Sequence, residues 1–285
     1  TPKISPELAQ ICLETVRSQA LEPAYKALAL SLPAEADIAR EIGSKIDPDA
    51  ILAARNTLAA TIAAANDEAF RTAYDSLADN GPYSPDAASA GRRALRNAML
   101  DYVTLASGQP DHASHQYRDA GNMTDRAAAL SVLAMRHPDA SETAEALAHF
   151  EARFGADPLV MDKWFQIQAM APGDGAVDRV RALMTHPAFS LGNPNRVRSL
   201  IGTYTTANQT GFHRADGAGY ELLAEIALSV DPKNPQLSAR LATAFRSWRS
   251  LEDGRREHAR ATLSRIKAAP TLSADLRDIV ERTLA

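Results

Sequence analysis

The sequence predicts an all-α protein, and three observations point to it. Alanine dominates long stretches, such as residues 52–60 and 126–130. Alanine loses the least free energy of any residue on entering a helix. Apolar residues recur in steps of three and four, as in Val160, Met161, Trp164 and Ile167, which is the spacing of one helix face. No stretch alternates apolar and polar residues convincingly, as a half-buried strand would.

The predicted helices begin at residues with a known preference for that position. Proline is tolerated in the first helical turn directly after a capping residue. This pattern marks starts at Ser5-Pro6, Asp47-Pro48, Ser84-Pro85, Asp157-Pro158 and Asp231-Pro232. Ser273 is the expected cap of the last helix, whose apolar stripe is Leu276, Ile279, Val280 and Leu284.

Helix starts recur roughly every 13 to 18 residues, except over about 49–107. There, two longer helices are expected on either side of Asn80-Gly81-Pro82-Tyr83. Short helices joined by tight turns favour an irregular right-handed superhelix, a solenoid-like stack of short antiparallel helix pairs similar to HEAT or armadillo repeats. No fixed-period repeat is visible. We expect one domain over residues 1–285, with a softer joint near 106–116.

Composition excludes several classes of function. A formal net charge of -4 over 285 residues gives no support to nucleic-acid binding. Cys12 is the only cysteine, so the chain has no internal disulfide and a cytoplasmic setting is favoured. No window approaches the roughly 18 apolar residues of a membrane span. The chain begins at Thr1 without an initiator methionine, which we interpret as an excised domain.

Candidate chemical groups are few. His112 and His115 are three apart and could share a helix face, which leaves a metal site open as one alternative, although no third ligand is evident. Cys12 lies on an apolar helix face and is expected to be a small buried hydrophobe. No zinc-protease, nucleophile-elbow or phosphate-loop motif occurs. Gly217-x-Gly219 is interpreted as a tight turn, with Asp216 capping a helix that starts near Ala218.

Two arginines, Arg198 and Arg240, lie on two separate predicted helices on either side of that turn. An arginine on a helix surface is usually solvated or paired with an acid, and contributes little. A guanidinium nevertheless has a rigid fork of donors that matches carboxylates and carbonyls. Two of them facing one cavity could hold the anionic end of a ligand.

Several short motifs, in order along nearly the whole chain, together resemble one known family. They are Ile46-Asp47-Pro48-Asp49-Ala50, Asn122-Met123-Thr124-Asp125-Arg126, Asp162-Lys163-Trp164-Phe165, Asn193 to Gly202, Phe212-His213, Asp216-Gly217-x-Gly219-Tyr220, Asn234-Pro235-Gln236 and Arg240-Leu241. The resemblance is to the C-terminal domain of bacterial aminopeptidase N (alanyl aminopeptidase), in the zinc gluzincin metallopeptidase family.

The resemblance implies a multidomain zinc aminopeptidase that removes N-terminal amino acids from peptides. In that family a separate domain holds the zinc and the catalytic residues, so none are expected here, no cofactor is expected to bind this chain, and the isolated chain should be inactive. The helical domain encloses the active-site chamber. Arginines matching Arg198 and Arg240 line its peptide-binding wall. The implied partners are the catalytic and other domains of the same polypeptide and peptide substrates, with no nucleic acid or membrane.

Two other interpretations stay open on the sequence alone. One is an independent helical-repeat scaffold that holds a protein partner in its concave face. The other is a stand-alone helical metalloenzyme that uses His112 and His115. The coding sequence upstream of Thr1 would separate the aminopeptidase from the scaffold.

Overall fold

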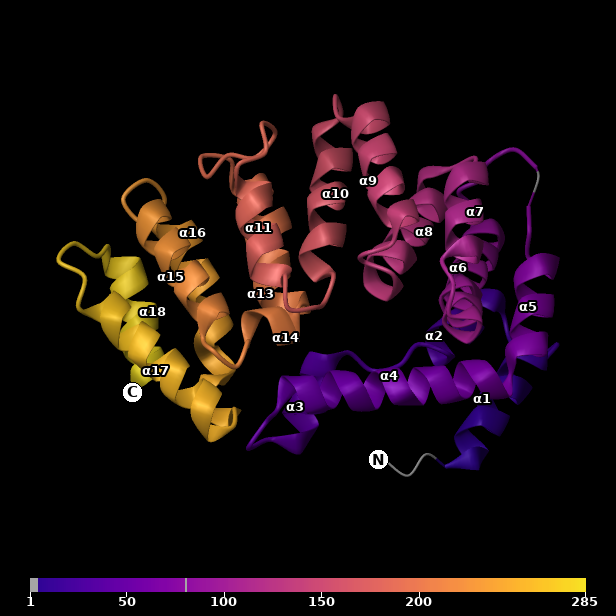
Figure 1. Cartoon of the computed structure of the whole chain (residues 1–285), viewed down its shortest axis with the longest axis horizontal. Helices are drawn as coiled ribbons and strands as arrows, with labels where there is room; N and C mark the ends of the chain where they lie inside the picture. The colour runs from indigo at the N-terminus through magenta and orange to yellow at the C-terminus, as the bar shows by residue number, and fades with distance from the viewer. Residues whose placement is uncertain (1–4, 80) are drawn as a thin grey trace. The chain divides into compact units, whose positions relative to one another are not determined.

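The computed structural model describes residues 5–79 and 81–285, and every named secondary-structure element within these residues is a helix (Figure 1). A single isolated β-bridge joins Ile46 and Leu251 in the described residues. The all-α prediction is confirmed. The chain forms two compact units: unit 1 comprises residues up to Pro33 and Leu52–Arg153, and unit 2 comprises Ala34–Ile51 and Phe154–Ala285.

Unit 1 is built around its longest helix, α6. Its helices are α1 (Pro6–Arg17), α2 (Pro23–Ala29), the main part of α4 (Pro48–Ala65), α5 (Asp67–Ser76), α6 (Ala87–Ser107), α7 (Asp111–Asp119), α8 (Met123–Arg136) and α9 (Ser141–Phe154). Helix α6 packs against α2, α5, α7 and α8. Phe70, Met99, Leu100 and Leu130 are fully buried in this core. Gly91 lets α2 approach closely, because a Cβ there would lie 3.1 Å from the backbone nitrogen of Ala24.

Unit 2 combines short helices and two irregular turns. Its elements are α3 (Glu35–Ile42), α10 (Pro158–Met170), α11 (Ala176–Met184), α12 (Pro194–Val197), the π-helical turn η1 (Arg198–Gly202), α13 (Thr203–Ala207), α14 (Gln209–Phe212), α15 (Ala218–Val230), α16 (Pro235–Ala242), the 3₁₀ segment η2 (Thr243–Ser250), α17 (Asp253–Lys267) and α18 (Ala274–Leu284). Helix α10 packs on η1 and α13, and α16 packs on α15 and α18. Tyr204, Phe212, Tyr220 and Phe245 form a buried aromatic cluster.

The segment that carries Ile46 and Asp47 is held in unit 2 by backbone and charge. Ile46 donates its N–H to the carbonyl of Ser250 at 2.8 Å, and its own carbonyl accepts from the N–H of Glu252 at 2.9 Å. Arg255, only 4% exposed, bonds to the carboxylates of Asp47 and Glu252 and to the carbonyl of His213. The segment is therefore fixed against α17 although it lies about 200 residues away in sequence.

Most predicted helix starts are confirmed, and two are wrong. Helices α1, α4 and α10 begin at Pro6, Pro48 and Pro158, and Ser273 caps α18. Helix α6 begins at Ala87 because the carboxylate of Asp86, not Ser84, accepts the N–H of Ser89 at 2.9 Å.

The second wrong start is Asp231-Pro232. Asp231 instead follows the last residue of α15, and its carboxylate accepts hydrogen bonds from the N–H and hydroxyl of Ser273. Helix α16 begins at Pro235, three residues after Pro232, and the side chain of Asn234 accepts the N–H of Leu237 at 3.0 Å. Two pairs of a capping residue and a proline, Asp231-Pro232 and Asn234-Pro235, lie close together in the sequence. Asn234 caps α16, whereas the carboxylate of Asp231 holds the start of α18.

The first of the two long helices expected over 49–107 is broken at Asn66. Its side chain is 4% exposed and donates to the carbonyls of Ala9 and Ile62, each at 3.1 Å. The break separates α4 from α5 and ties both to α1. The expected joint near 106–116 is a short turn between α6 and α7, inside unit 1, and the chain divides elsewhere. The single-domain assignment, and the superhelix with its hand, stay predictions.

Candidate functional site

Arg198 is presented to solvent by a local irregularity in unit 2. The side chain of Asn193 accepts the N–H groups of Asn195 and Arg196 at 3.0 and 3.3 Å, which starts α12. The helix then widens into the π-helical turn η1, whose first residue is Arg198. Such turns are rare in proteins as a whole, but those that occur are often found at functional sites. The Arg198 guanidinium is exposed and donates to the side-chain oxygen of Asn195 at 2.8 Å.

The neighbouring Arg196, in contrast to Arg198, is buried. It is 6% exposed, bonds to the carboxylate of Asp162 and the carbonyl of Ala188, and lies over the ring of Phe165. Arg196 therefore fixes α12 to α10. Because Arg196 lies two residues before Arg198, it fixes the backbone from which the Arg198 side chain extends.

Arg240 lies on α16, near the C-terminal end of that helix. Its neighbours Ser238, Ala239 and Leu241 are buried, whereas the Arg240 side chain is exposed. Among the described residues, no carboxylate lies within ion-pair distance of it. Arg198 and Arg240 thus belong to elements with different main packing partners. Both guanidiniums are accessible to a ligand.

The glycine turn between the two arginines is structural. Gly217 has a φ of 78°, in the left-handed region that favours glycine. At Gly219 a Cβ would lie 2.2 Å from the carbonyl oxygen of Phe212, so only glycine fits. The side chain of Asp216 accepts the N–H of Ala218 at 3.0 Å, as expected for the start of α15. The interpretation as a tight turn is confirmed.

His213 and Tyr220 close this turn from inside. The Nδ1 atom of His213 lies 2.9 Å from the Tyr220 hydroxyl, and His213 is 3% exposed. Burial, followed by the charge of Arg255, lowers the pKa of His213 to about 4. His213 is therefore neutral at physiological pH and serves as a hydrogen-bonding core residue.

The histidine pair considered as a metal site is not arranged as one. The Nε2 atom of His112 lies 2.7 Å from a guanidinium nitrogen of Arg71, and a cation there opposes metal binding. Burial, followed by the Arg71 charge, lowers the pKa of His112. Within residues 5–79 and 81–285, no three His, Cys, Asp or Glu side chains group in a way that could hold a metal ion. Cys12 is buried, as expected.

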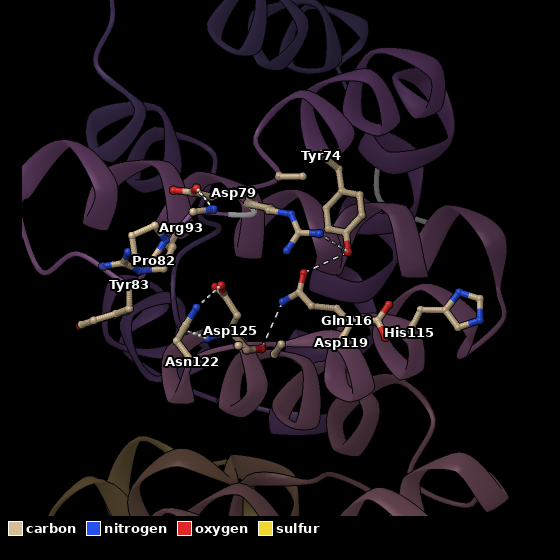
Figure 2. Close-up of a pocket in the computed structure, with 15 residues that line it drawn as sticks. Tyr74, Asp79, Pro82, Tyr83, Arg93, His115, Gln116, Asp119, Asn122 and Asp125 are labelled. Atoms are coloured by element: carbon tan, nitrogen blue, oxygen red, sulfur yellow. Dashed lines mark hydrogen bonds between the residues drawn. The ribbon is translucent and has the colours of Figure 1, made fainter.

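A pocket of about 280 Å³ in unit 1 was not anticipated from the sequence (Figure 2). Its walls come from α5, α6, α7, the start of α8 and the turns between them. The lining residues with polar or charged side chains are Tyr74, Asp79, Tyr83, Arg93, Arg96, His115, Gln116, Asp119, Asn122 and Asp125. Figure 2 shows the hydrogen bond from the Tyr74 hydroxyl to the side chain of Gln116, which is 3.0 Å long. The sequence signal was present in the pair Arg93 and Arg96, which share one face of α6.

None of the described helices is long and apolar enough to cross a lipid bilayer.

Comparisons with known proteins cover the whole chain. Residues 1–285 match the family model described as "Domain of unknown function (DUF3458_C) ARM repeats". Aminopeptidase N of Caulobacter vibrioides is 39% identical over 271 residues, which is 93% of this chain and 31% of that protein. Aminopeptidase N of Haemophilus influenzae is 33% identical over 282 residues, or 99% of this chain and 32% of that protein. The Escherichia coli protein of the same name is 34% identical over 269 residues, covering 93% and 30%.

A solved structure is similar over nearly the same range. It is the crystal structure of Legionella pneumophila aminopeptidase A in complex with aspartic acid. It has a TM-score of 0.89 and 27% identity, and the match covers 99% of this chain and 34% of that chain. The chain therefore spans about a third of the length of the proteins it matches.

Proposed function

Because the chain belongs to the DUF3458_C family of ARM repeats, and corresponds to the C-terminal helical domain of aminopeptidase N homologues, we propose that it works as part of a zinc-dependent aminopeptidase. The enzyme would remove N-terminal amino acids from peptides. The observation that carries this proposal is the family match over residues 1–285, together with 33–39% identity to three proteins named aminopeptidase N. The independent helical-repeat scaffold is not favoured, because these relatives are named as enzymes.

The chemistry of bond cleavage is assigned to another part of the polypeptide. The described residues of this chain lack a group of three or more side chains suited to zinc, and His112 is occupied by Arg71. The residues that cleave the peptide bond are therefore proposed to lie elsewhere in the polypeptide. Its proposed contribution is enclosure: a helical wall that limits entry to the active-site chamber and reduces bulk water around the reacting peptide bond.

Arg198 and Arg240 are proposed to bind the substrate on the leaving-group side. A guanidinium can donate two parallel hydrogen bonds to a carboxylate, or one to a backbone carbonyl. Both guanidiniums are exposed on unit 2, and neither is neutralised by an acid of the described residues. Such groups can hold the carbonyls or the C-terminal carboxylate of a short peptide.

Kinetics of the full-length enzyme test this role. Arg240→Ala should lower kcat/KM for a tripeptide by roughly three- to tenfold, the effect of losing one exposed charge-assisted contact. Turnover of an amino-acid 4-nitroanilide, which lacks a peptide leaving group, should change less than twofold. Arg277→Ala, at another exposed arginine of unit 2, is the matched control. Equal losses on both substrates would contradict the assignment of Arg240 to the peptide wall.

The cellular setting is part of the same proposal. A lone buried cysteine is typical of a protein that does not depend on disulfides. We propose a cytoplasmic enzyme acting on peptides, with the other domains of its own polypeptide as partners and with no nucleic acid or membrane.

A further inference from the structure

The pocket of unit 1 contains two arginines in an unusual state. Arg93 and Arg96 lie one turn apart on α6 and both line it. Arg93 is 9% exposed, and its guanidinium lies 4.7 Å from the centre of the Tyr83 ring. The Arg96 guanidinium lies 4.5 Å from the centre of the Tyr74 ring and donates to the Tyr74 hydroxyl at 3.2 Å. Aromatic rings thus hold both guanidiniums in place.

Neither guanidinium has a charge partner at contact distance. Within the described part of the chain, no carboxylate forms an ion pair with Arg93 or Arg96, and the Nε atoms of both are buried without a hydrogen-bond partner. A buried charge without a partner is costly. Other buried arginines of this chain, such as Arg196 and Arg255, bond to carbonyls and carboxylates. Arg93 and Arg96 differ from Arg196 and Arg255 in that the described residues supply no carboxylate at contact distance and leave their Nε atoms without a hydrogen-bond partner.

Within the described residues, the carboxylates of the same pocket form no ion pair with Arg93 or Arg96. Asp125, 8% exposed, accepts a hydrogen bond from the side chain of Asn122 at 2.8 Å (Figure 2). It accepts a second from the side chain of Asn97 at 2.9 Å. Asp119 is exposed, and no cation of the described residues pairs with it. The carboxylate of Asp79 forms an ion pair with the guanidinium of Arg92, at 3.6 Å, and not with Arg93 or Arg96. The pocket thus offers charges of both signs that do not neutralise each other.

We propose that this pocket binds a small zwitterion, a free α-amino acid. The ligand carboxylate would accept hydrogen bonds from Arg93 and Arg96, and its ammonium group would face Asp119 and Asp125. A simple anion would gain the first contact but meet the repulsion of the two aspartates, and a simple cation the reverse. The volume of about 280 Å³ lies just below the roughly 300–1,000 Å³ of sites for drug-sized ligands, which suits a ligand as small as an amino acid. The inference does not depend on the proposed peptidase function.

Isothermal titration calorimetry on the full 285-residue chain tests it. The probes are L-leucine and L-phenylalanine, their amides, which lack the carboxylate, and their N-acetyl derivatives, which lack the ammonium charge. We expect the amino acids to bind, and both derivatives to bind at least about tenfold more weakly, because each loses a charge-assisted contact. Arg96→Gln should weaken amino-acid binding by a similar factor.

Two further variants keep the result interpretable. Asp119→Asn changes an exposed residue, so it should fold normally and weaken amino-acid binding several-fold. The N-acetyl derivative is an anion that loses one repulsion in this variant, so it should bind no more weakly than to the parent chain. Arg118→Gln, an exposed arginine on α7 whose guanidinium contacts Ser114, is the matched control and should bind as the parent chain does. No heat of binding up to about 10 mM amino acid would overturn the proposal. So would amides that bind as well as the acids, or affinities within twofold of the parent in both Arg96→Gln and Asp119→Asn.

Discussion

Gly219→Ala should destabilise unit 2 severely, for a reason that geometry supplies. The added Cβ would lie 2.2 Å from the carbonyl oxygen of Phe212, where 3.0 Å is the practical minimum, and 2.7 Å from the carbonyl oxygen of Gly211. These are backbone atoms, so they cannot give way by a change of rotamer. Either the start of α15 moves away from α14, or the backbone of Phe212 moves.

Neither movement is cheap. The Phe212 ring is fully buried, with its centre 5.3 Å from that of Tyr220 and 5.8 Å from that of Phe245. Overpacking a tight core costs about 1–3 kcal/mol, occasionally more. Here backbone and an aromatic cluster must shift together, so we expect about 3 kcal/mol or more. At about 2–4 °C per kcal/mol for a unit of this size, the melting temperature should fall by roughly 6–12 °C.

Tryptophan fluorescence during urea unfolding measures this effect selectively. The chain has 2 tryptophans, Trp164 and Trp248, and both lie in unit 2. With a slope of about 2 kcal/mol per molar urea, the midpoint should fall by about 1.5 M. Gly192→Ala is the control in the same unit: its nearest neighbour would be the Ser190 hydroxyl at 3.5 Å, an ordinary contact, so its stability should stay within about 0.5 kcal/mol. A Gly219→Ala chain within 1 kcal/mol of the parent would refute this account of the turn.

Three other predictions concern acid stability, the helix break and metal. Burial lowers the pKa of His213 from 6.5 to about 4, so only the unfolded chain takes up this proton between those values. Lowering the pH from about 6.5 to 4 should therefore remove up to about 3 kcal/mol of stability, and His213→Gln should flatten that loss in urea midpoints measured against pH. Asn66→Ala leaves the carbonyls of Ala9 and Ile62 without their donor and should cost about 2 kcal/mol by circular dichroism melting, whereas the exposed Gln10→Ala should cost little. The 285-residue chain alone should not hydrolyse alanine 4-nitroanilide, with or without added zinc, and zinc-dependent turnover by that chain would contradict the assignment of cleavage to another part of the polypeptide.

Local features of this fold could be predicted where one residue decides them. Pro48 and Pro158 begin helices because proline fits only the first turn, and Gly217 adopts the left-handed conformation that the turn requires. The confirmed elements share this property: a steric or hydrogen-bonding demand that acts within four residues. The all-α class follows in the same way from the sum of many local preferences.

Features that depend on a distant partner could not be predicted from the sequence. Asp231 reads as a helix cap, but its carboxylate is used by Ser273, 42 residues later. The break at Asn66 is stabilised by the carbonyl of Ala9, 57 residues earlier. The pocket of unit 1 is a third case, since Tyr83 and Asp125 line one pocket only after α5 to α8 have packed. In each case a tertiary contact selects among local options that the sequence leaves nearly equal in free energy.

The arginines show why residue type alone does not identify a site. Arg196 and Arg198 are two residues apart in one motif, yet the first is buried against Asp162 and the second is exposed. Arg126 on α8 bonds to the carbonyl of Tyr117 on α7 at 2.7 Å and, like Arg196, joins one helix to another. These groups are satisfied within the fold, so replacing them should affect stability first. An arginine that neither an acid nor a carbonyl of the fold satisfies is a better candidate for ligand binding. We therefore propose Arg198 and Arg240 in unit 2, and the ring-stacked pair Arg93 and Arg96 in unit 1, as ligand-binding positions.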